Sequence, residues 1–148
     1  MANLLGVIAS LASTLFAGAA LYVNLVEHPA RLSCGTEIAA LQWAPSYKRA
    51  TVMQVCLAVL ATLAGLARWW IGGGTMWLAA SLLIISVVPF TILVILPTNS
   101  RLMEPGRDRA SAETRALLDR WGRLHAVRTA LSLLASCGFI WALSKGVG

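Results

Sequence analysis

Four long stretches with almost no charge constrain this chain more than any other feature of its sequence. Residues 4–26, 50–67 and 75–96 contain no charged side chain. A fourth charge-free stretch, residues 129–144, is shorter, and its helix must begin near residue 124 to cross a membrane. A transmembrane helix needs about 20 apolar residues, so the pattern predicts four membrane-spanning helices. The runs are continuously apolar, whereas membrane β-strands alternate apolar and polar residues.

The composition supports a bilayer rather than water as the solvent. The 148-residue chain is 58% hydrophobic and 12% charged, which is about half the charged share of a soluble domain. Its formal net charge is +6, and because the basic residues lie beside apolar runs, anionic lipid headgroups explain them better than nucleic acid does. We therefore expect an all-α fold, an integral membrane bundle of four antiparallel transmembrane helices, and a single domain over residues 1–148.

The residues between the apolar runs set the expected helix bounds. Pro45 suits the start of the second helix, glycines 72–74 separate the second and third helices, and Pro97 ends the third helix. Pro89 is expected to kink that helix. The expected helices are residues 4–27, 46–68, 75–97 and 111–144, with a polar loop at 98–110.

Small residues recur every four positions along the first helix. There are two such rows: Gly6, Ser10, Thr14 and Gly18, and Ala9, Ser13 and Ala17. Small side chains let membrane helices approach one another closely. We expect these rows to pack inside the bundle, and the alternative is an oligomer formed through this face of the first helix.

The basic residues also predict an orientation. All of them except Arg68 and Lys145 fall on one side of the expected bundle. The positive-inside rule then places the loops after the first and third helices in the cytoplasm. Both termini are expected on the non-cytoplasmic side of what we take to be a bacterial plasma membrane.

Polar residues gather where the first helix ends, the second begins, the third ends and the fourth begins. On the fourth helix, Trp121, His125, Arg128 and Ser132 recur at helical spacing and form one stripe. Lipid cannot solvate an ionisable group, so such groups normally face the bundle interior or a wet cavity. We predict a pocket with apolar walls that opens toward the cytoplasmic side. The other helices contribute Asn24, Glu27, His28, Tyr47, Arg49, Gln54 and Asn99.

Plain structural explanations exist for several of these residues. Arg128 can snorkel to the headgroups, Glu27 can form a helix-end ion pair with Arg31, and Trp121 can belong to an interfacial belt. His125 is harder to explain in this way, because it shares a stripe with Arg128 and has Glu27 as an expected partner.

A metal site is an open alternative. Glu27, His28 and His125 have the side chains of iron or copper ligands, and two histidines can ligate a haem. However, no helix carries the Glu-x-x-His pattern of di-iron bundles. A bound metal or haem is therefore not favoured, and the cofactor stays unknown.

The same residues form motifs that resemble a known family. They are Tyr22-x-x-x-x-Glu27-x-Pro29-Ala30, Trp43-x-x-x-Tyr47-x-Arg49, Leu96-Pro97-Thr98-Asn99-x-x-Leu102 and Trp121-x-x-x-His125-x-x-Arg128-Thr129. The set resembles the anthrone oxygenase-like family of small four-helix membrane proteins, many of whose bacterial members have no assigned function. The resemblance spans essentially the whole chain, and its last motif is the most specific.

The resemblance implies a membrane oxygenase that oxidises an anthrone to an anthraquinone with molecular oxygen as co-substrate. His125 would remove the acidic methylene proton, while Arg128 or Asn99 would stabilise the enolate oxygen. The expected substrate is a hydrophobic aromatic molecule, anthrone- or hydroquinone-like. The expected catalytic residues are His125, Arg128, Glu27 and Asn99, and the expected substrate-binding residues are Trp121, Tyr47, Arg49, Gln54, Asn24 and His28.

Two other function classes remain open from the sequence. One is a haem- or metal-dependent membrane redox protein that uses His28 and His125. The other is a non-enzymatic protein that binds a lipid or small molecule, in which Arg31, Arg49 and Arg128 hold an anionic group.

Overall fold

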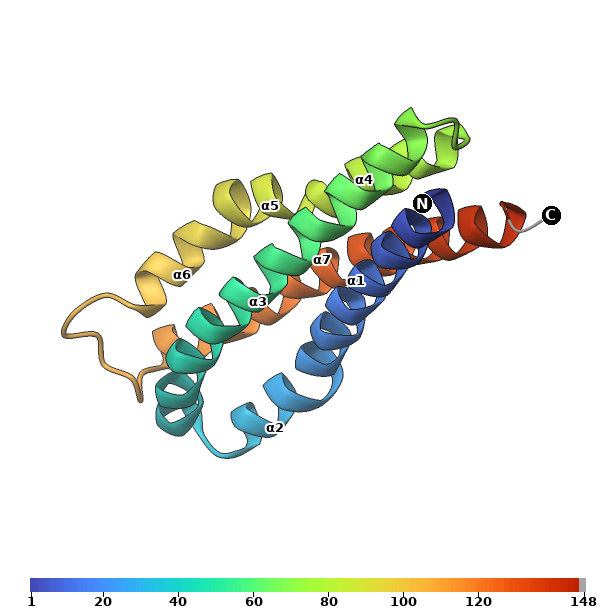
Figure 1. The fold of residues 1–148 in the computed structure, drawn as a ribbon. Coiled ribbons are helices and arrows are strands. Elements are labelled where there is room, and N and C mark those ends of the chain that lie inside the picture. The colour runs from blue at the N-terminus through green and yellow to red at the C-terminus, as the bar shows by residue number, and fades with distance from the viewer. Residues whose placement is uncertain (147–148) are drawn as a thin grey trace.

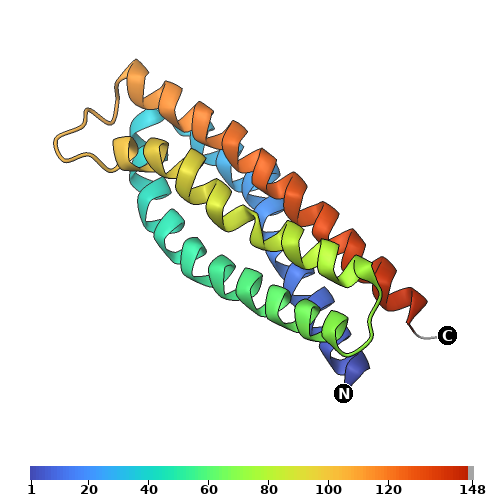
Figure 2. The same cartoon turned by 90° about the horizontal axis from the view of Figure 1, so that it is seen from above.

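Four helical rods run antiparallel and side by side, with both termini at one end (Figure 1, Figure 2). The computed structural model describes residues 1–146. The rods, each long and apolar enough to cross a membrane, are Ala2–Ser33, Thr36–Trp70, Thr75–Leu102 and Ala112–Lys145. Residues 1–146 contain no strand. The predicted all-α bundle is confirmed, and the chain is an integral multi-pass membrane protein.

Two of the rods contain a π-helical turn. The first rod is built from α1 (Ala2–Tyr22), η1 (Val23–Glu27) and α2 (His28–Ser33), and the third from α4 (Thr75–Ile85), α5 (Val87–Phe90), η2 (Thr91–Ile95) and α6 (Leu96–Leu102). The second and fourth rods are the single helices α3 (Thr36–Trp70) and α7 (Ala112–Lys145). A π-helical turn is wider than an α-turn and is often found at functional sites. Both turns lie in the half of the bundle away from the termini, where the polar residues gather.

The second rod begins at Thr36, well before the expected start at residue 46, and contains Pro45 in its interior. The chain breaks one residue earlier, at Gly35, whose φ of 95° lies in the left-handed region that glycine tolerates. Pro45 removes one helical hydrogen bond to the carbonyl of Leu41. Both residues are exposed, so water or headgroups can bond that carbonyl and the helix continues.

The third rod also extends further than its prolines suggest. It continues through Pro97 to Leu102, which leaves residues 103–111 as the polar loop. Pro97 lies in the first turn of α6, where its missing N–H costs little. The rod is interrupted instead at Ser86, one turn before Pro89, because the Pro89 ring cannot donate to the Ile85 carbonyl.

Two apolar cores are separated by a polar layer. The larger core lies toward the termini and contains Phe16, Trp77 and Phe139, while the smaller core lies toward the polar loop and contains Trp43 and Trp121. Buried polar side chains occupy the level between them: Gln54, His125, Arg128, Thr129 and Ser132. This polar layer is a candidate site, because lipid cannot solvate such groups and they must be satisfied inside the bundle.

The small-residue rows of α1 are used inside the chain. Ala9 and Ser13 are fully buried, and a Cβ at Gly6 would lie 2.8 Å from the Trp77 ring. The same Cβ would lie 3.0 Å from the Leu143 side chain of α7. Small residues thus let α1 approach its neighbours closely, and it packs mainly along α3 and α7. Gly18 is exposed, and contact between two copies of the chain through this face stays a prediction.

Candidate functional site

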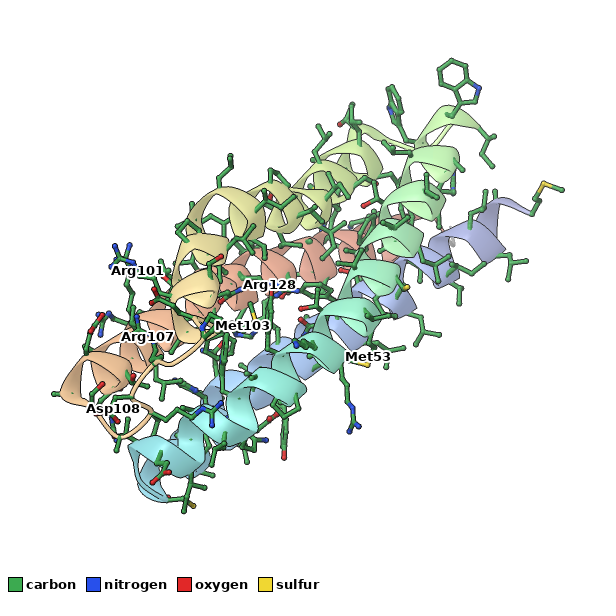
Figure 3. The ribbon with its side chains drawn as sticks, turned by 90° about the vertical axis from the view of Figure 1, so that its left-hand side faces the viewer. Met53, Arg101, Met103, Arg107, Asp108 and Arg128 are labelled. Atoms are coloured by element: carbon green, nitrogen blue, oxygen red, sulfur yellow. The ribbon has the colours of Figure 1, made fainter. Side chains whose placement is uncertain are left out.

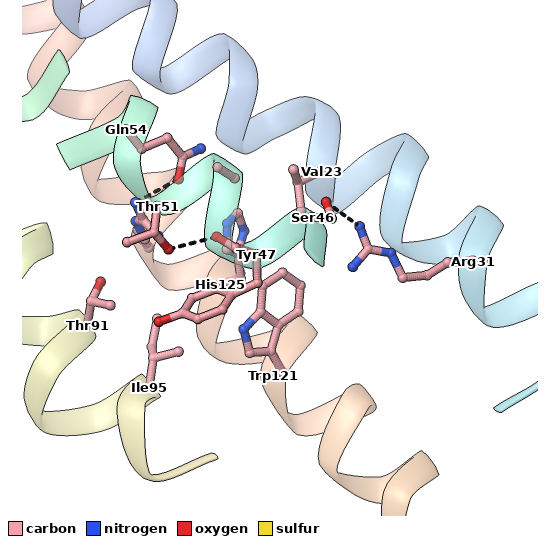
Figure 4. Close-up of a pocket in the computed structure, with 12 residues that line it drawn as sticks. Val23, Arg31, Ser46, Tyr47, Thr51, Gln54, Thr91, Ile95, Trp121 and His125 are labelled. Carbon is pink, nitrogen blue, oxygen red and sulfur yellow. Dashed lines mark hydrogen bonds between the residues drawn. The ribbon is translucent and has the colours of Figure 1, made fainter. Parts of the chain in front are cut away.

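Two adjoining cavities lie in the polar layer. The inner compartment has a volume of about 20 Å³, room for one water-sized molecule, and its walls include Arg31, Trp121 and His125 (Figure 4). The outer compartment has a volume of about 330 Å³ and mainly apolar walls. The residues that line both compartments are Tyr47, Thr51, Gln54, Thr91 and Arg128. The shared wall makes the two cavities parts of one site.

Arg128 is the central charge of this site. Its side chain lies inside the bundle, away from the arginines of the polar loop (Figure 3), and the residue is only 6% exposed. Its Nη2 donates to Oε1 of Gln54 at 2.7 Å, and its guanidinium carbon lies 5.0 Å from the Phe16 ring centroid. No carboxylate among residues 1–146 pairs with it. A buried guanidinium without a counter-ion is a strong binding group for an anion.

The depth of Arg128 fits a site inside the bilayer. The helical rise places it about 25 Å from Lys145 along α7, and Lys145 anchors the opposite interface in a hydrocarbon core of about 30 Å. Arg128 therefore lies just inside the core, near the end of the bundle that carries the polar loop.

His125 is held by a hydrogen bond that fixes its tautomer. Asn24 donates from Nδ2 to the Gly122 carbonyl at 3.1 Å, so its Oδ1 faces His125. Oδ1 lies 2.8 Å from Nδ1 of His125 and is also bonded by the Thr129 hydroxyl. Since an amide oxygen only accepts, the neutral imidazole carries its proton on Nδ1. The lone pair on Nε2 is left available as a base in the wall of the inner compartment.

This arrangement differs from the expected pairing of His125 with Glu27. Glu27 instead forms an ion pair with Arg31 and accepts from Ser46 at 2.7 Å and Gln42 at 3.1 Å. The reason is the early start of α3, which brings Gln42 and Ser46 next to α2. Glu27 lines neither compartment, and its contacts with the site are through Arg31 and Ser46, which both line the inner compartment.

A run of aromatic rings forms the end of the inner compartment. The Trp121 ring centroid lies 4.8 Å from that of His125 and 5.8 Å from that of Trp43. Trp43 stacks in turn on Tyr47 at 5.2 Å with an interplanar angle of 3°. Of these rings, Tyr47, Trp121 and His125 line the inner compartment, and Tyr47 also lines the outer one.

His28 braces the helices rather than facing the site. Its Nε2 lies 3.1 Å from the Leu118 carbonyl and must be the donor, and its ring packs on Gly122, where a Cβ would lie 2.8 Å away. The carbonyl therefore fixes the opposite tautomer from that of His125. His28 lines neither compartment.

Two further expected residues lie apart from the compartments. Arg49 is exposed and lines a surface hollow with Gln42 and Met53, and this hollow shares Ser46 and Ala50 with the inner compartment. Asn99 is fully buried in α6, and its side-chain oxygen and nitrogen have no hydrogen-bond partner. Arg49 lies apart because it is on the exposed face of α3. Asn99 lies apart because it is in the part of α6 that continues beyond Pro97.

The candidate metal ligands are not brought together. Within the described part of the chain, no group of three or more His, Cys, Asp and Glu side chains is close enough to hold a metal ion. Glu27 is engaged with Arg31, His28 with Leu118, and His125 with Asn24.

Several residues of the site were missed in the sequence. Thr51 lies between Tyr47 and Gln54 at helical spacing, the same pattern that singled out the α7 stripe, so it could have been found. Thr91 is the single hydroxyl residue between Ser86 and Pro97. No such pattern marks the other lining residues, which are mostly apolar and include Val23, Ser46 and Ile95 of the inner compartment and Phe16, Val55 and Ile92 of the outer one.

Comparison with known proteins matches the part of the chain that runs from α3 to α7. The family model described as "Anthrone oxygenase" matches residues 43–138, from Trp43 to just beyond the polar layer of α7. The anthrone oxygenase tpcL of Aspergillus fumigatus is 44% identical over 68 residues, which cover 44% of this chain and 42% of that protein. An anthrone oxygenase of Claviceps purpurea is 29% identical over 154 aligned positions, covering 94% of this chain and 88% of that protein.

No solved structure matches the chain significantly. The family match nevertheless covers well over half of its residues and includes all five residues that line both compartments. By this match, the chain belongs to the anthrone oxygenase family.

Proposed function

We propose that this protein oxidises a hydrophobic anthrone- or hydroquinone-like molecule with O2 in the two-compartment site. The observation that carries the proposal is Arg128, a buried guanidinium without a carboxylate, which lines both compartments beside the free Nε2 side of His125. One group can hold an oxyanion and the other can take a proton. This pair is what enolisation of an aryl ketone requires.

The outer compartment supports an aromatic substrate. Its volume of about 330 Å³ lies within the range of about 300–1,000 Å³ that is common for small-molecule sites. Its walls are apolar except for Tyr47, Thr51, Gln54, Thr91 and Arg128. A flat ring system would leave water or lipid for these walls and direct its single oxygen to Arg128.

The first step is a proton transfer. An anthrone has a methylene group that is acidic because its carbanion is conjugated with the ketone. His125 lines only the inner compartment, so its Nε2 takes that proton through one water molecule held there, and the Arg128 guanidinium stabilises the resulting enolate oxygen. In a site without bulk water, this attraction is stronger than it would be in solution.

The second stage is oxidation by O2. The enolate gives one electron to O2, and the carbon radical and superoxide combine to a peroxide, which takes the proton held by His125. Loss of the second methylene proton and cleavage of the O–O bond then release water and form the new carbonyl. The balance is one anthrone and one O2 to one anthraquinone and one water, and the inner compartment has room for a molecule of the size of O2 or water.

The test is oxygen uptake by the purified protein in liposomes with a simple anthrone. We expect uptake above the spontaneous rate, in a ratio of one O2 per anthrone. With ¹⁸O2, one labelled atom should appear in the new carbonyl and one in water. Heat-unfolded protein in the same liposomes is the control.

Two outcomes would count against the proposal. Uptake equal to that of the unfolded control would remove the oxygenase function. Quinone without label would mean that the new oxygen comes from water, and the peroxide route would then be wrong.

We also propose that the site lies at the cytoplasmic end of the bundle, because nearly all basic residues lie there. Cys34 is a natural reporter, since it is exposed beside Gly35 at the same end, whereas Cys56 and Cys137 lie within the spans. A membrane-impermeant maleimide should label Cys34 in inside-out vesicles and spare it in intact cells. Cys34→Ser is the control, and labelling of Cys34 in intact cells would reverse the orientation.

A further inference from the structure

The second and third rods separate where the third is interrupted. α3 packs closely along α4, but its backbone makes almost no close approach to α5, η2 or α6. Figure 1 shows the two rods diverging from the α3–α4 turn toward the polar loop. The third rod is interrupted between α4 and α5, where Pro89 cannot donate a helical hydrogen bond to the Ile85 carbonyl.

The outer compartment lies at this separation. Its walls include Val55 on α3, Ile92 on η2 and Leu96 at the start of α6. All three side chains are exposed on the outside of the bundle, which in this chain means exposed to lipid. The compartment is therefore open on its side, and its rim is apolar.

The route along the axis of the bundle, from the polar loop to the compartments, is closed. The smaller apolar core fills the bundle between the compartments and the polar loop, with Trp43, Trp121, Ile95 and Leu118 all buried. The expected pocket with a polar mouth toward the cytoplasm is not found on this axis, and the polar hollow that shares Ser46 and Ala50 with the inner compartment lies on the side of α3. The buried side chains of Trp43 on α3 and Trp121 on α7 fill the position that such an opening would occupy.

We propose that the site takes its substrate sideways from the bilayer, through a lateral window between α3 and η2 rimmed by Val55, Ile92 and Leu96. The inference rests on the proposed function for the identity of the substrate. The molecule that fits is flat, polycyclic and apolar, and it carries one ketone or phenol oxygen at an edge. The apolar part passes the rim, and the oxygen reaches the unpaired guanidinium of Arg128 at the inner end.

Ile92 and Leu93 provide a matched pair of variants. Both lie in η2 and both are exposed, at 55% and 74%, but Ile92 lines the outer compartment and Leu93 does not. Ile92→Trp places a bulky side chain at the window, whereas Leu93→Trp adds the same side chain to the lipid-facing surface. Tryptophan is well tolerated near membrane interfaces, so both variants should fold.

The measurement is stopped-flow binding of a fluorescent monohydroxyanthraquinone to the protein in liposomes, beside turnover of the anthrone. The quinone has the ring system and oxygen of the substrate but cannot be oxidised by the proposed reaction. An obstructed entrance slows association and dissociation together, so Ile92→Trp should lower both rates by about tenfold and leave Kd within about threefold of the parent. Leu93→Trp should match the parent.

The outcomes separate this inference from the proposed reaction. Slow binding in Ile92→Trp supports the window even if no variant turns over an anthrone. Equal association rates in the two variants, with turnover intact, would overturn the window and leave the oxygenase standing. A weaker Kd with unchanged association would also overturn it, because Ile92 would then be part of the binding surface and not of an entrance.

Discussion

Arg128→Met is expected to stop turnover and at the same time stabilise the protein. The enolate would lose its oxyanion partner, and loss of one such group typically lowers kcat by about 10²- to 10³-fold. Stability should rise because an arginine without a counter-ion is costly inside a membrane. Gln54 loses the hydrogen bond from Arg128, and this loss lowers the gain in stability by about 1 kcal/mol. A net gain of about 1–2 kcal/mol is expected.

Oxygen uptake and the unfolding midpoint in detergent measure the two effects. Arg123→Met is the matched control, since Arg123 is exposed on the same helix and lines neither compartment. It should change neither quantity by more than a small amount. If Arg128→Met lost stability together with activity, the guanidinium would be a structural element of the bundle, and its role in holding an oxyanion would lose its main support.

Asn24→Ala is expected to lower turnover by about 10²-fold or more without removing any group that touches the substrate. Asn24 Oδ1 holds the proton of His125 on Nδ1. Without that acceptor the imidazole can carry its proton on Nε2, and the base then faces away from the inner compartment. Asn24→Asp keeps an acceptor in the same place and should retain much more activity than Asn24→Ala. This makes Asn24 a positioning residue.

The tautomer itself can be measured by ¹⁵N NMR of histidine-labelled protein. The chain has two histidines, and the structure gives them opposite tautomers, Nδ1–H for His125 and Nε2–H for His28. In Asn24→Ala only the His125 signals should change, so His28 is an internal control. If the Nδ1–H signal of His125 survived in Asn24→Ala, the assigned role of Asn24 would be wrong, whatever happened to the rate.

Much of the fold follows from hydropathy, and the exceptions share one cause. Pro45 and Pro97 were expected to mark helix boundaries, yet helices pass through both. A proline removes one donor and adds one clash. Neither the lost donor nor the clash ends a helix where the affected carbonyl is exposed, or where a π-helical turn has already widened the helix. The sequence shows where a proline stands, but it does not show whether the carbonyl four residues earlier is exposed to water or headgroups.

The candidate site was predictable on α7 and much less so on the other helices. Trp121, His125 and Arg128 form a regular stripe, and all three line the inner compartment. The partner of His125 could not be read in this way, because η1 alters the helical register between α1 and α2. Asn24 and Glu27 both follow a plausible spacing, and only the π-helical turn decides that Asn24 faces α7. The lateral window had no sign in the sequence, since it depends on where two helices fail to touch.

The side opening changes what concentration means for this protein. A site that faces the hydrocarbon responds to the number of substrate molecules per lipid, and the amount dissolved in the buffer acts only through partitioning. Adding empty lipid at constant total substrate dilutes the substrate around α3 and η2, although nothing in the aqueous phase has been altered. A half-saturation constant then belongs to the protein and the membrane jointly. The partitioning of each molecule into the bilayer thereby contributes to the specificity of the protein, because only molecules that the membrane dissolves reach the site.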